Sequence, residues 1–240
     1  MIIVSDYDRT LKIDGKISDN NLKAIKRFRE LGNIFVINTG RSYQYFQKEM
    51  KNQSFSFDYA ICGSGSQIVD NQFKLIDFTQ INVEEITSLI DRIYESSALL
   101  FQFSSPNYYE VHKREDNTWN EPDFIESINT CACRFNTIEE ASSFHSTIKC
   151  GEISAHLNYF SIDMTHKNTN KSNGIDRLIE QLSLDRSHIY VIGDGINDLP
   201  MIIKFNGYAV ENAQDSVKIQ AKGIFKEVAD LIDYVIKEND

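Results

Sequence analysis

Three short apolar runs constrain the fold of this 240-residue chain most strongly, because polar residues follow each of them closely. Continuous apolar runs of this length are typical of strands that are covered on both faces, as in a parallel sheet. The carboxyl ends of such strands meet at one edge of an open α/β sheet, and ligands bind at that edge. The runs are residues 2–4, 34–37 and 189–192, and the polar residues after them are Asp6 with Asp8, Asn38 with Thr39, and Asp194 with Asp198.

Helical patterns separate these runs. A helix is predicted over residues 19–31, because Ser18 is a suitable N-cap and Gly32 a suitable stop. A second helix is predicted over residues 173–182, ahead of the last run, and a further strand over residues 59–62. This alternation of strand and helix predicts an α/β fold with a doubly wound, Rossmann-like parallel sheet.

The middle of the chain follows another pattern, in which short strands come directly after one another. That order is typical of an α+β unit with an antiparallel sheet. We therefore predict that a parallel-sheet core of residues 1–78 and 166–240 is interrupted by an inserted α+β domain of residues 79–165. The helices of the insert are expected near 83–96 and 138–148, and its strands near 99–103, 108–112, 131–135, 153–159 and 161–164.

The composition argues against several classes of function. A formal net charge of −10 disfavours a general nucleic-acid binder, since affinity for the phosphate backbone comes mainly from clustered Lys and Arg. No apolar run approaches the roughly 20 residues that span a bilayer, and the first strand leaves no room for a leader ahead of it. We expect a cytoplasmic monomer or small homo-oligomer without nucleic-acid or membrane partners. Its cysteines are expected to be reduced packing residues, namely Cys62, Cys131, Cys133 and Cys150.

Carboxylates gather at the predicted strand ends. Asp6 and Asp8 are two residues apart, and side chains at that spacing point the same way along a strand. Asp194 and Asp198 follow the last run and would reach the same edge of the sheet. Carboxylates in one crevice repel each other unless a cation neutralises them, and oxygen ligands favour a hard divalent ion. We therefore predict a Mg²⁺ site.

Two further residues extend this set toward phosphoryl transfer. Thr39 offers a hydroxyl donor and Lys171 a positive charge, both suited to phosphoryl oxygens. One carboxylate can then attack phosphorus, while the other protonates the departing alkoxide and later takes a proton from the water that cleaves the acyl phosphate. Arg41 is a third candidate for phosphate binding, because a basic side chain there would draw an anion to an acidic protein.

The spacing of these residues resembles four motifs of a known family. Asp-Tyr-Asp-Arg-Thr at residues 6–10, Thr39, Lys171 and Gly-Asp-Gly-Ile-Asn-Asp at residues 193–198 are similar to the signature motifs of the haloacid dehalogenase (HAD) superfamily. The long insertion between Thr39 and Lys171 resembles that of its Cof-like sugar-phosphate phosphatases, which carry an α+β cap domain. The resemblance covers essentially the whole chain and implies an enzyme, a HAD-type phosphoric monoester hydrolase.

The resemblance also implies roles for the site residues. Asp6 would be the nucleophile that forms an aspartyl-phosphate, and Asp8 the general acid/base. Mg²⁺ would be bound by the Asp6 carboxylate, the Asp8 backbone carbonyl and Asp194, with Asp198 as an additional ligand or close neighbour. The dehalogenase branch lacks an acid where Asp8 stands, which favours phosphoester hydrolysis over carbon–halogen cleavage. Thr39 and Lys171 would hold the phosphate. Gly40, Arg41 and Asn197 are further candidates for phosphate binding, which the resemblance does not assign.

Two questions about basic side chains stay open at this point: the direction of Arg9, and whether Lys167 or Lys171 binds the phosphate. Arg9 stands where many members of the family have Gly, and its side chain would either face away from the pocket or add positive charge to it. Lys167 would compete with Lys171 for the phosphate, and Lys171 is preferred because it opens the helix predicted over residues 173–182.

The substrate is expected to be a small phosphorylated metabolite, such as a sugar phosphate, a nucleotide or a phosphorylated cofactor, selected by the cap. Two alternatives stay open. A phosphosugar mutase would use the same intermediate but require a bisphosphate activator, and a non-catalytic phosphate-binding regulator would require a damaged catalytic set. The candidate selectors in the cap are Tyr108, Tyr109, His112, Arg114, Trp119, Arg134 and His156.

Overall fold

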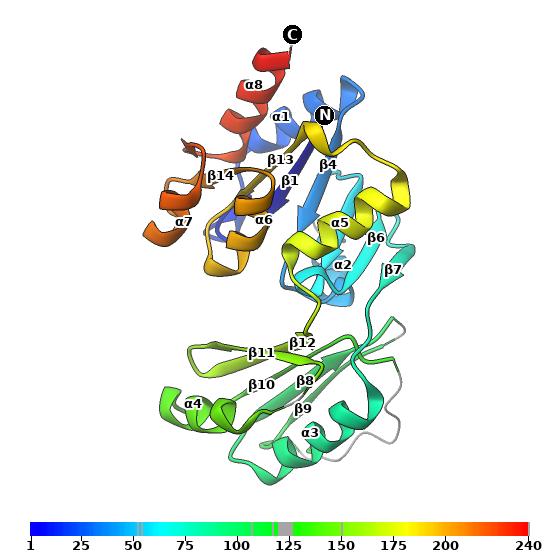
Figure 1. Ribbon diagram of the computed structural model, residues 1–240, viewed down its shortest axis with the longest axis vertical. Coiled ribbons are helices and arrows are strands. Elements are labelled where there is room, and N and C mark those ends of the chain that lie inside the picture. The colour runs from blue at the N-terminus through cyan, green and yellow to red at the C-terminus, as the bar shows by residue number, and fades with distance from the viewer. Residues whose placement is uncertain are drawn as a thin grey trace. The chain divides into compact units, whose positions relative to one another are not determined.

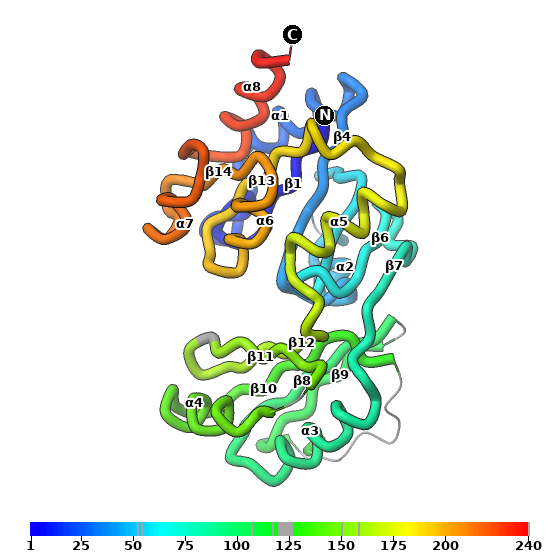
Figure 2. Tube along the Cα trace, in the orientation of Figure 1, coloured from blue at the N-terminus to red at the C-terminus, as the bar shows by residue number. Residues whose placement is uncertain are grey.

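The computed structural model describes the whole chain except residues 52, 54, 107, 117, 120–126, 150 and 240 (Figure 1). The chain forms two compact units, one made of Met1–Asp77 with Asn170–Asp240 and the other of Phe78–Thr169. Figure 2 shows that the chain leaves the first unit once, after β7 (Leu75–Phe78), and returns once, before α5 (Lys171–Leu182). The second unit is therefore a single insertion into the first.

The first unit is built on an eight-stranded sheet in the order β15-β14-β13-β1-β4-β5-β6-β7. The strands from β15 to β5 pair in parallel, as predicted, whereas β6 is antiparallel to β5. The chain reverses in the one-turn helix η1 (Gly63–Gly65), where Ser64 has a φ of 52°. The bounds are β1 Ile2–Asp6, β4 Ile34–Asn38, β5 Tyr59–Cys62, β6 Gln67–Asp70, β13 Ile189–Gly193, β14 Asn206–Val210 and β15 Ile224–Phe225, with a separate small hairpin of β2 Lys12–Ile13 and β3 Lys16–Ile17.

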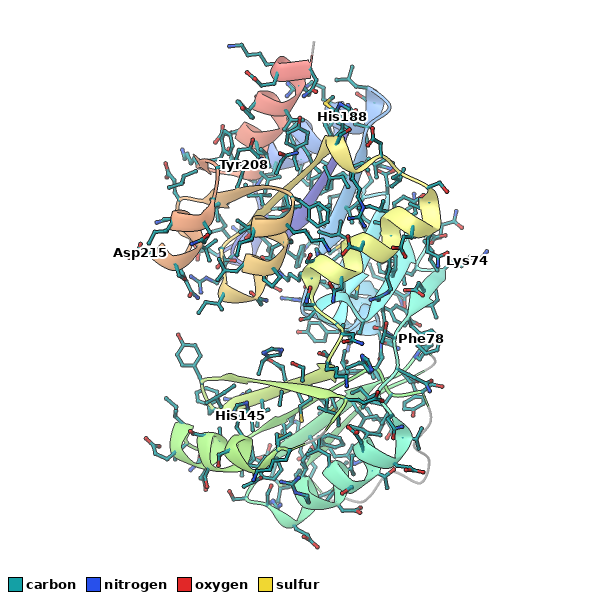
Figure 3. The ribbon with its side chains drawn as sticks, viewed as in Figure 1. Lys74, Phe78, His145, His188, Tyr208 and Asp215 are labelled. Atoms are coloured by element: carbon teal, nitrogen blue, oxygen red, sulfur yellow. The ribbon has the colours of Figure 1, made fainter. Side chains whose placement is uncertain are left out.

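Helices cover both faces of this sheet. On one face α1 (Asp19–Glu30) packs beside α8 (Val228–Asn239), and on the other α5 packs beside α6 (Leu199–Lys204) (Figure 1). The predicted N-cap of α1 is confirmed, because the Ser18 side chain accepts the backbone N–H of Asn21. The ring of Tyr208 of β14, labelled in Figure 3, has its centroid 5.9 Å from that of Tyr234 of α8. Two further α-helices of this unit are α2 (Tyr43–Met50) and α7 (Asp215–Gln220).

The central strand β1 lies between β13 and β4, and this order positions the site. Asp6, the last residue of β1, is paired in register with Asn38, the last residue of β4. β13 ends at Gly193, so that Asp194 follows directly on the other side of Asp6. The polar residues after the three apolar runs therefore meet at one edge, as the sequence predicted.

The second unit is an α+β domain with a five-stranded antiparallel sheet in the order β11-β12-β10-β8-β9. Its apolar core includes Ile86, Leu89, Ile90 and Ile93 from one face of its first helix. The predicted fold class, an α/β core with an inserted α+β cap, is thus confirmed. The bounds are α3 Val83–Glu95, β8 Leu100–Ser104, β9 Tyr109–Lys113, β10 Thr130–Arg134, α4 Ile138–Thr147, β11 Ile153–Asn158 and β12 Ser161–His166.

Two other predictions concern the chain as a whole. Within the described ranges, no helix combines the length and apolar character needed to cross a membrane. Cys62, Cys131 and Cys133 are buried, in agreement with packing cysteines, and Cys150 lies outside the described residues.

Candidate active site

A buried lysine bridges two buried carboxylates at the end of β1. Lys171 Nζ lies 2.5 Å from Asp6 Oδ1 and 2.5 Å from Asp198 Oδ1. The Lys171 side chain is only 1% exposed. Because an unpaired buried charge costs several kcal/mol, such a lysine is stable only with its carboxylate partners in place. The three side chains therefore form one electrostatic unit.

The position of Lys171 is fixed by its backbone. It is the first residue of α5, and the N-cap Asn170 accepts the backbone N–H of Asn173 through its side chain. The Asn38 side chain donates from Nδ2 to the carbonyl oxygen of Lys171 at 3.0 Å, which ties this helix start to the end of β4. Lys167, the alternative phosphate ligand, is exposed and belongs to the inserted unit.

Close packing of glycine also constrains this helix start. Gly65 has a φ of +102°, and a Cβ added there would lie 2.2 Å from the carbonyl oxygen of Asn170. A residue larger than glycine would therefore displace Asn170 or the turn that carries Gly65.

The turn after β13 positions the other two carboxylates. Asp198 Oδ2 accepts the backbone N–H groups of Asp194 and Gly195, each at 2.9 Å, so its own side chain closes the turn. A Cβ at Gly193 would lie 2.4 Å from the Asp198 carboxyl carbon, which explains the glycine there. Asp194 Oδ1 accepts the hydroxyl of the buried Thr10 at 3.1 Å.

Burial and mutual repulsion shift the pKa values of these groups. Burial raises the pKa of Asp6 from its ordinary 3.8 to about 8; Lys171 opposes this rise, while Asp198 and Asp194 add to it. The pKa of Asp194 is also raised, first by burial and then by the charge of Asp198. Burial lowers the pKa of Lys171, but Asp198 and Asp6 outweigh it and raise the pKa above its usual value. The site is therefore short of positive charge.

The donor set fits a hard divalent cation. Carboxylate oxygens of Asp6, Asp194 and Asp198 lie within 4.8 Å of one another, and all three residues are buried. Among the described residues, the cations paired with these three carboxylates are the buried ammonium of Lys171 and the mostly exposed guanidinium of Arg9, so the buried cluster stays short of positive charge without a metal ion. Oxygen-only ligands of this kind are those that Mg²⁺ and Ca²⁺ prefer. The cluster can hold a metal ion.

Asp8 lies apart from this cluster. β1 ends at Asp6, so the alternation that predicted a common direction for the two side chains does not extend to Asp8. The Asp8 side chain is 46% exposed, and both of its oxygens accept from Arg41, from Nε at 2.7 Å and from Nη2 at 2.6 Å. Glu49 of α2 forms an ion pair with Nη1 of the same guanidinium. The structure thus brings Asp8 and Arg41 into direct contact.

Three of the predicted phosphate-binding residues lie in the turns that follow β4 and β13, namely Thr39, Gly40 and Asn197. Thr39 is buried, and its Oγ1 accepts the backbone N–H of Arg41 at 3.2 Å, so the hydroxyl proton is still able to donate. Gly40 is exposed, and a Cβ there would lie 3.5 Å from Ser64 Oγ. Asn197 is exposed in the one-turn helix η3 (Ile196–Asp198).

Arg9 adds positive charge beside the cluster. Its Nε lies 3.4 Å from Asp194 Oδ2, and its side chain is 65% exposed. The φ of Arg9 is 65°, in the left-handed region that glycine adopts without strain. This conformation accounts for the glycine that the family resemblance leads one to expect there. Of the two placements considered, the structure gives the one that adds charge.

Most candidate selectors in the inserted unit make contacts within that unit. His112 stacks on Phe103 with ring centroids 5.6 Å apart, and its Nδ1 lies 2.9 Å from the Thr118 carbonyl oxygen. The Arg114 guanidinium lies 4.3 Å from the Trp119 ring centroid. The other four make the following contacts: Tyr108 with the Phe103 ring, Tyr109 with Gln102 Oε1, Arg134 with the Phe160 ring and His156 with Ser154 Oγ.

Three contributing residues were not singled out from the sequence. Thr10 lies within the first motif and orients Asp194, so its hydroxyl was visible but its partner was not. Asn38 precedes Thr39 and holds the backbone of Lys171. Glu49 gave no signal, because its contact with Arg41 depends on how the short helix α2 is placed.

Comparison with known proteins gives one family. The family model described as haloacid dehalogenase-like hydrolase matches residues 3–233. The chain is 27% identical over 225 residues to the 5-amino-6-(5-phospho-D-ribitylamino)uracil phosphatase YcsE of Bacillus subtilis (strain 168), an alignment that covers 90% of this chain and 86% of that protein.

Solved structures share the fold. A haloacid dehalogenase-like hydrolase from B. subtilis has a TM-score of 0.82 at 15% identity, with 97% of this chain and 99% of that chain covered. A HAD subclass IIB sugar phosphatase has a TM-score of 0.78 at 18% identity, with 97% and 98% covered. At these identities the likeness concerns the arrangement of the elements.

Proposed function

The chain belongs to the haloacid dehalogenase-like hydrolase family, and from this we propose that it is a Mg²⁺-dependent phosphatase that acts through an aspartyl-phosphate on Asp6. One observation carries the proposal: Lys171 bridges Asp6 and Asp198 in a buried site at the carboxyl end of β1. A buried lysine held between two acids has little other use at a strand edge where ligands bind.

Asp6 is the proposed nucleophile. One oxygen of its carboxylate attacks phosphorus, an O–P bond forms, and the bond from phosphorus to the substrate oxygen breaks. The departing alkoxide takes a proton from Asp8. Water then attacks the acyl phosphate while Asp8 takes its proton, and inorganic phosphate leaves with Asp6 restored.

The phosphoryl oxygens are bound by donors around Asp6. Lys171 supplies a charge and Thr39 its hydroxyl proton. Arg41 uses three of its five N–H groups on Asp8 and Glu49, and the other two can reach an incoming phosphate. Gly40 leaves space for the phosphate beside the backbone, and Asn197 adds an amide donor from an exposed turn.

The metal site is proposed to be a Mg²⁺ site. Asp6 and Asp194 would hold the ion with the Asp8 backbone carbonyl, and Asp198 would lie close to it or bind it directly. When bound, Mg²⁺ supplies a Lewis acid that offsets the repulsion between a carboxylate and a phosphate. Lys171 holds the Asp6 carboxylate in place, and the Thr10 hydroxyl orients Asp194.

The substrate is proposed to be a small metabolite with a phosphate on a sugar or polyol chain. The names of two similar proteins support this, one a phosphatase of a phosphoribitylamino-uracil and the other a sugar phosphatase. In the substrates that both names indicate, the phosphate is carried on a hydroxylated carbon chain. The inserted unit, Phe78–Thr169, is proposed to be the cap that selects the rest of the molecule.

The test is phosphate release from a panel of phosphorylated sugars, polyols and nucleotides, together with a generic aryl phosphate, with and without EDTA. Asp6→Asn is expected to abolish turnover without unfolding the protein. Asp91→Asn, a matched change at an exposed position of α3, is expected to leave turnover unchanged. Normal activity of Asp6→Asn, or full activity in EDTA, would show that the proposal is wrong.

A further inference from the structure

The five-stranded sheet of the inserted unit has one face that its helices cover and one that they do not. Successive side chains of a strand point to opposite faces. Phe103, Cys131 and Ile162 pack with Ile90 of α3 and Ala141 of α4 in the apolar core of the unit. The residues that alternate with them lie on the opposite face, where none of the described helices of the unit packs (Figure 1). We call this opposite face the open face.

Strand register arranges the open face in rows that cross the sheet. Asp163 of β12 is paired with His156 of β11 on one side and with Ala132 of β10 on the other, and Ala132 is paired with Gln102 of β8. The next row lies about 7 Å away, because a strand rises about 3.4 Å per residue. One small ligand can therefore contact both rows. All residues of this second row carry a hydroxyl, and they are Ser154, Thr165, Thr130, Ser104 and Tyr109.

One hydroxyl of the second row lacks a partner. Thr165 is 6% exposed, and within the described ranges its Oγ1 has no hydrogen-bond partner. By contrast, the Tyr109 hydroxyl donates to Gln102 Oε1 at 3.0 Å, and the hydroxyl oxygens of Ser104 and Thr130 are 2.6 Å apart. Burial of a hydroxyl without a hydrogen bond is unfavourable, so an unpaired hydroxyl on a polar face is typical of a position that a ligand completes.

Charge limits what this face can bind. With histidine neutral, Asp163 is the one charged residue of these two rows, all of whose members lie in the described ranges, and it is exposed. Arg134 and Lys113 belong to the row on the other side of Asp163 from Thr165. There Arg134 lies over the Phe160 ring and Lys113 pairs with Asp116. An acceptor carboxylate beside hydroxyls suits a sugar or polyol, whereas it repels a second phosphate.

We propose that the open face binds the part of the substrate that carries no phosphate, through Asp163 and the row of hydroxyls that includes Thr165. It selects a neutral, hydroxylated chain over one with a second phosphate. This inference rests on the proposed function, in which the inserted unit selects the substrate. It narrows the substrate class to monophosphates of sugars or polyols, and it disfavours the bisphosphate activator that a phosphosugar mutase would need.

The experiment measures phosphate release by the full chain with Mg²⁺ from ribitol monophosphate, ribitol bisphosphate and nitrophenyl phosphate, the last of which has no hydroxyl chain. The unaltered protein should have a higher kcat/KM for the monophosphate than for the bisphosphate. Asp163→Asn is expected to lower kcat/KM for the monophosphate about tenfold, because a hydrogen bond to a charged acceptor becomes one to a neutral acceptor. Nitrophenyl phosphate should change by less than about twofold.

The bisphosphate tests the charge argument directly. Both ribitol esters lose the same hydrogen bond in Asp163→Asn, so that loss cancels in the ratio of their kcat/KM values. The ratio of bisphosphate to monophosphate should rise about fivefold, as for removal of the repulsion between two unit charges about 4 Å apart in water.

A second variant separates ligand binding from folding. Thr165→Val removes the unpaired hydroxyl and keeps the shape of the side chain. It should lower kcat/KM for ribitol monophosphate about threefold to tenfold without lowering Tm, since a hydroxyl that has no partner does not stabilise the free protein. Asp91→Asn, at an exposed position of α3, is the matched control and should change none of the three substrates.

Each outcome decides the question. An equal loss for all three substrates in Asp163→Asn would overturn the inference, because the change would then act on folding or on the phosphoryl step. An unchanged ratio of bisphosphate to monophosphate would also overturn it, as would an unaltered protein that prefers the bisphosphate or does not hydrolyse ribitol monophosphate. A lower Tm of Thr165→Val would refute the role of that hydroxyl. If the unaltered protein does not hydrolyse nitrophenyl phosphate either, the proposed function itself fails.

Discussion

Replacing Lys171 with methionine tests the electrostatic unit at the centre of the site. Methionine has a similar length and no charge, so the change removes the ammonium that lies 2.5 Å from both Asp6 Oδ1 and Asp198 Oδ1. Two buried carboxylates then face each other without their common partner. We expect a large loss of stability that depends on pH.

The size of the loss follows from the burial of the pair. Removing one partner of a buried ion pair costs about 3–5 kcal/mol, because the remaining charge is left uncompensated. Protonation of Asp6 limits this cost, so the lower end, about 3 kcal/mol, is expected at pH 8 without metal. For a chain of this size each kcal/mol shifts Tm by about 2–4 °C, which gives a fall of roughly 6–12 °C.

The sign of the pH dependence follows from Asp6. Lys171 lowers the pKa of Asp6 against burial, so its removal raises that pKa beyond about 8. At pH 5 the Asp6 carboxyl is protonated in both proteins, and the missing ammonium matters less. Because Asp6 of the unaltered protein loses its proton only near pH 8, the Tm difference between the two proteins should be clearly larger at pH 9 than at pH 5.

The assay is scanning calorimetry of the unaltered protein and of Lys171→Met in EDTA at both pH values. Lys167→Met, at an exposed lysine of the inserted unit, is the matched control and should shift Tm by less than about 1 °C. With metal, Lys171→Met should also lower kcat/KM by about 10²–10³-fold, as for the loss of a group that stabilises the transition state. A Tm difference that is equal at pH 5 and pH 9 would refute the reasoning.

Three further predictions concern the same edge of the sheet. Gly193→Ala would place a Cβ 2.4 Å from the Asp198 carboxyl carbon, and we expect urea denaturation to show a loss of about 1–3 kcal/mol together with weaker activity; an unchanged protein would mean that the turn is not tightly packed. In EDTA the folded protein holds the Asp6 proton up to about pH 8, far above its ordinary pKa, so stability should fall from pH 5 to pH 8. Added Mg²⁺ should accordingly raise Tm more at pH 8 than at pH 5, and a Tm gain that does not vary with pH would contradict this. Arg9→Gly removes both the strain of a φ of 65° and a cation 3.4 Å from Asp194, so unfolding should change by less than about 1 kcal/mol while titration shows tighter Mg²⁺ binding; weaker binding would mean that Arg9 supports the metal site.

The core of the fold can be predicted from the sequence, because the spacing of apolar residues reflects which side chains are buried in each strand and helix. The apolar runs at β1, β4 and β13 carry little else than packing, and strand order alone brings Asp6, Asn38 and Asp194 together. The short strands β6 and β7 were not predicted. They follow a tight reversal at Ser64, which has a positive φ. A serine in the sequence gives no indication of that conformation.

The positions of site residues could be predicted where the backbone places them. They could not be predicted where a side chain can reach several different partners. Lys171 is the first residue of a helix, and its neighbours follow from that. Asp8 was expected to point with Asp6 by strand alternation, but the strand ends at Asp6, two residues before Asp8, so that rule does not apply. Its contact with Arg41, and that of Arg41 with Glu49, depends on long side chains whose directions a linear pattern does not record.

The close packing of Gly65 on Asn170 fixes the point at which the chain returns from the inserted unit. The inserted unit ends at Thr169, and the next two residues are Asn170, packed against Gly65, and Lys171 of the candidate site. Because Gly65 and Asn170 both belong to the first unit, a different insert could replace residues 78–169 without displacing Lys171. We therefore expect that an insert of another sequence could be joined at this point while Lys171 keeps its place between Asp6 and Asp198.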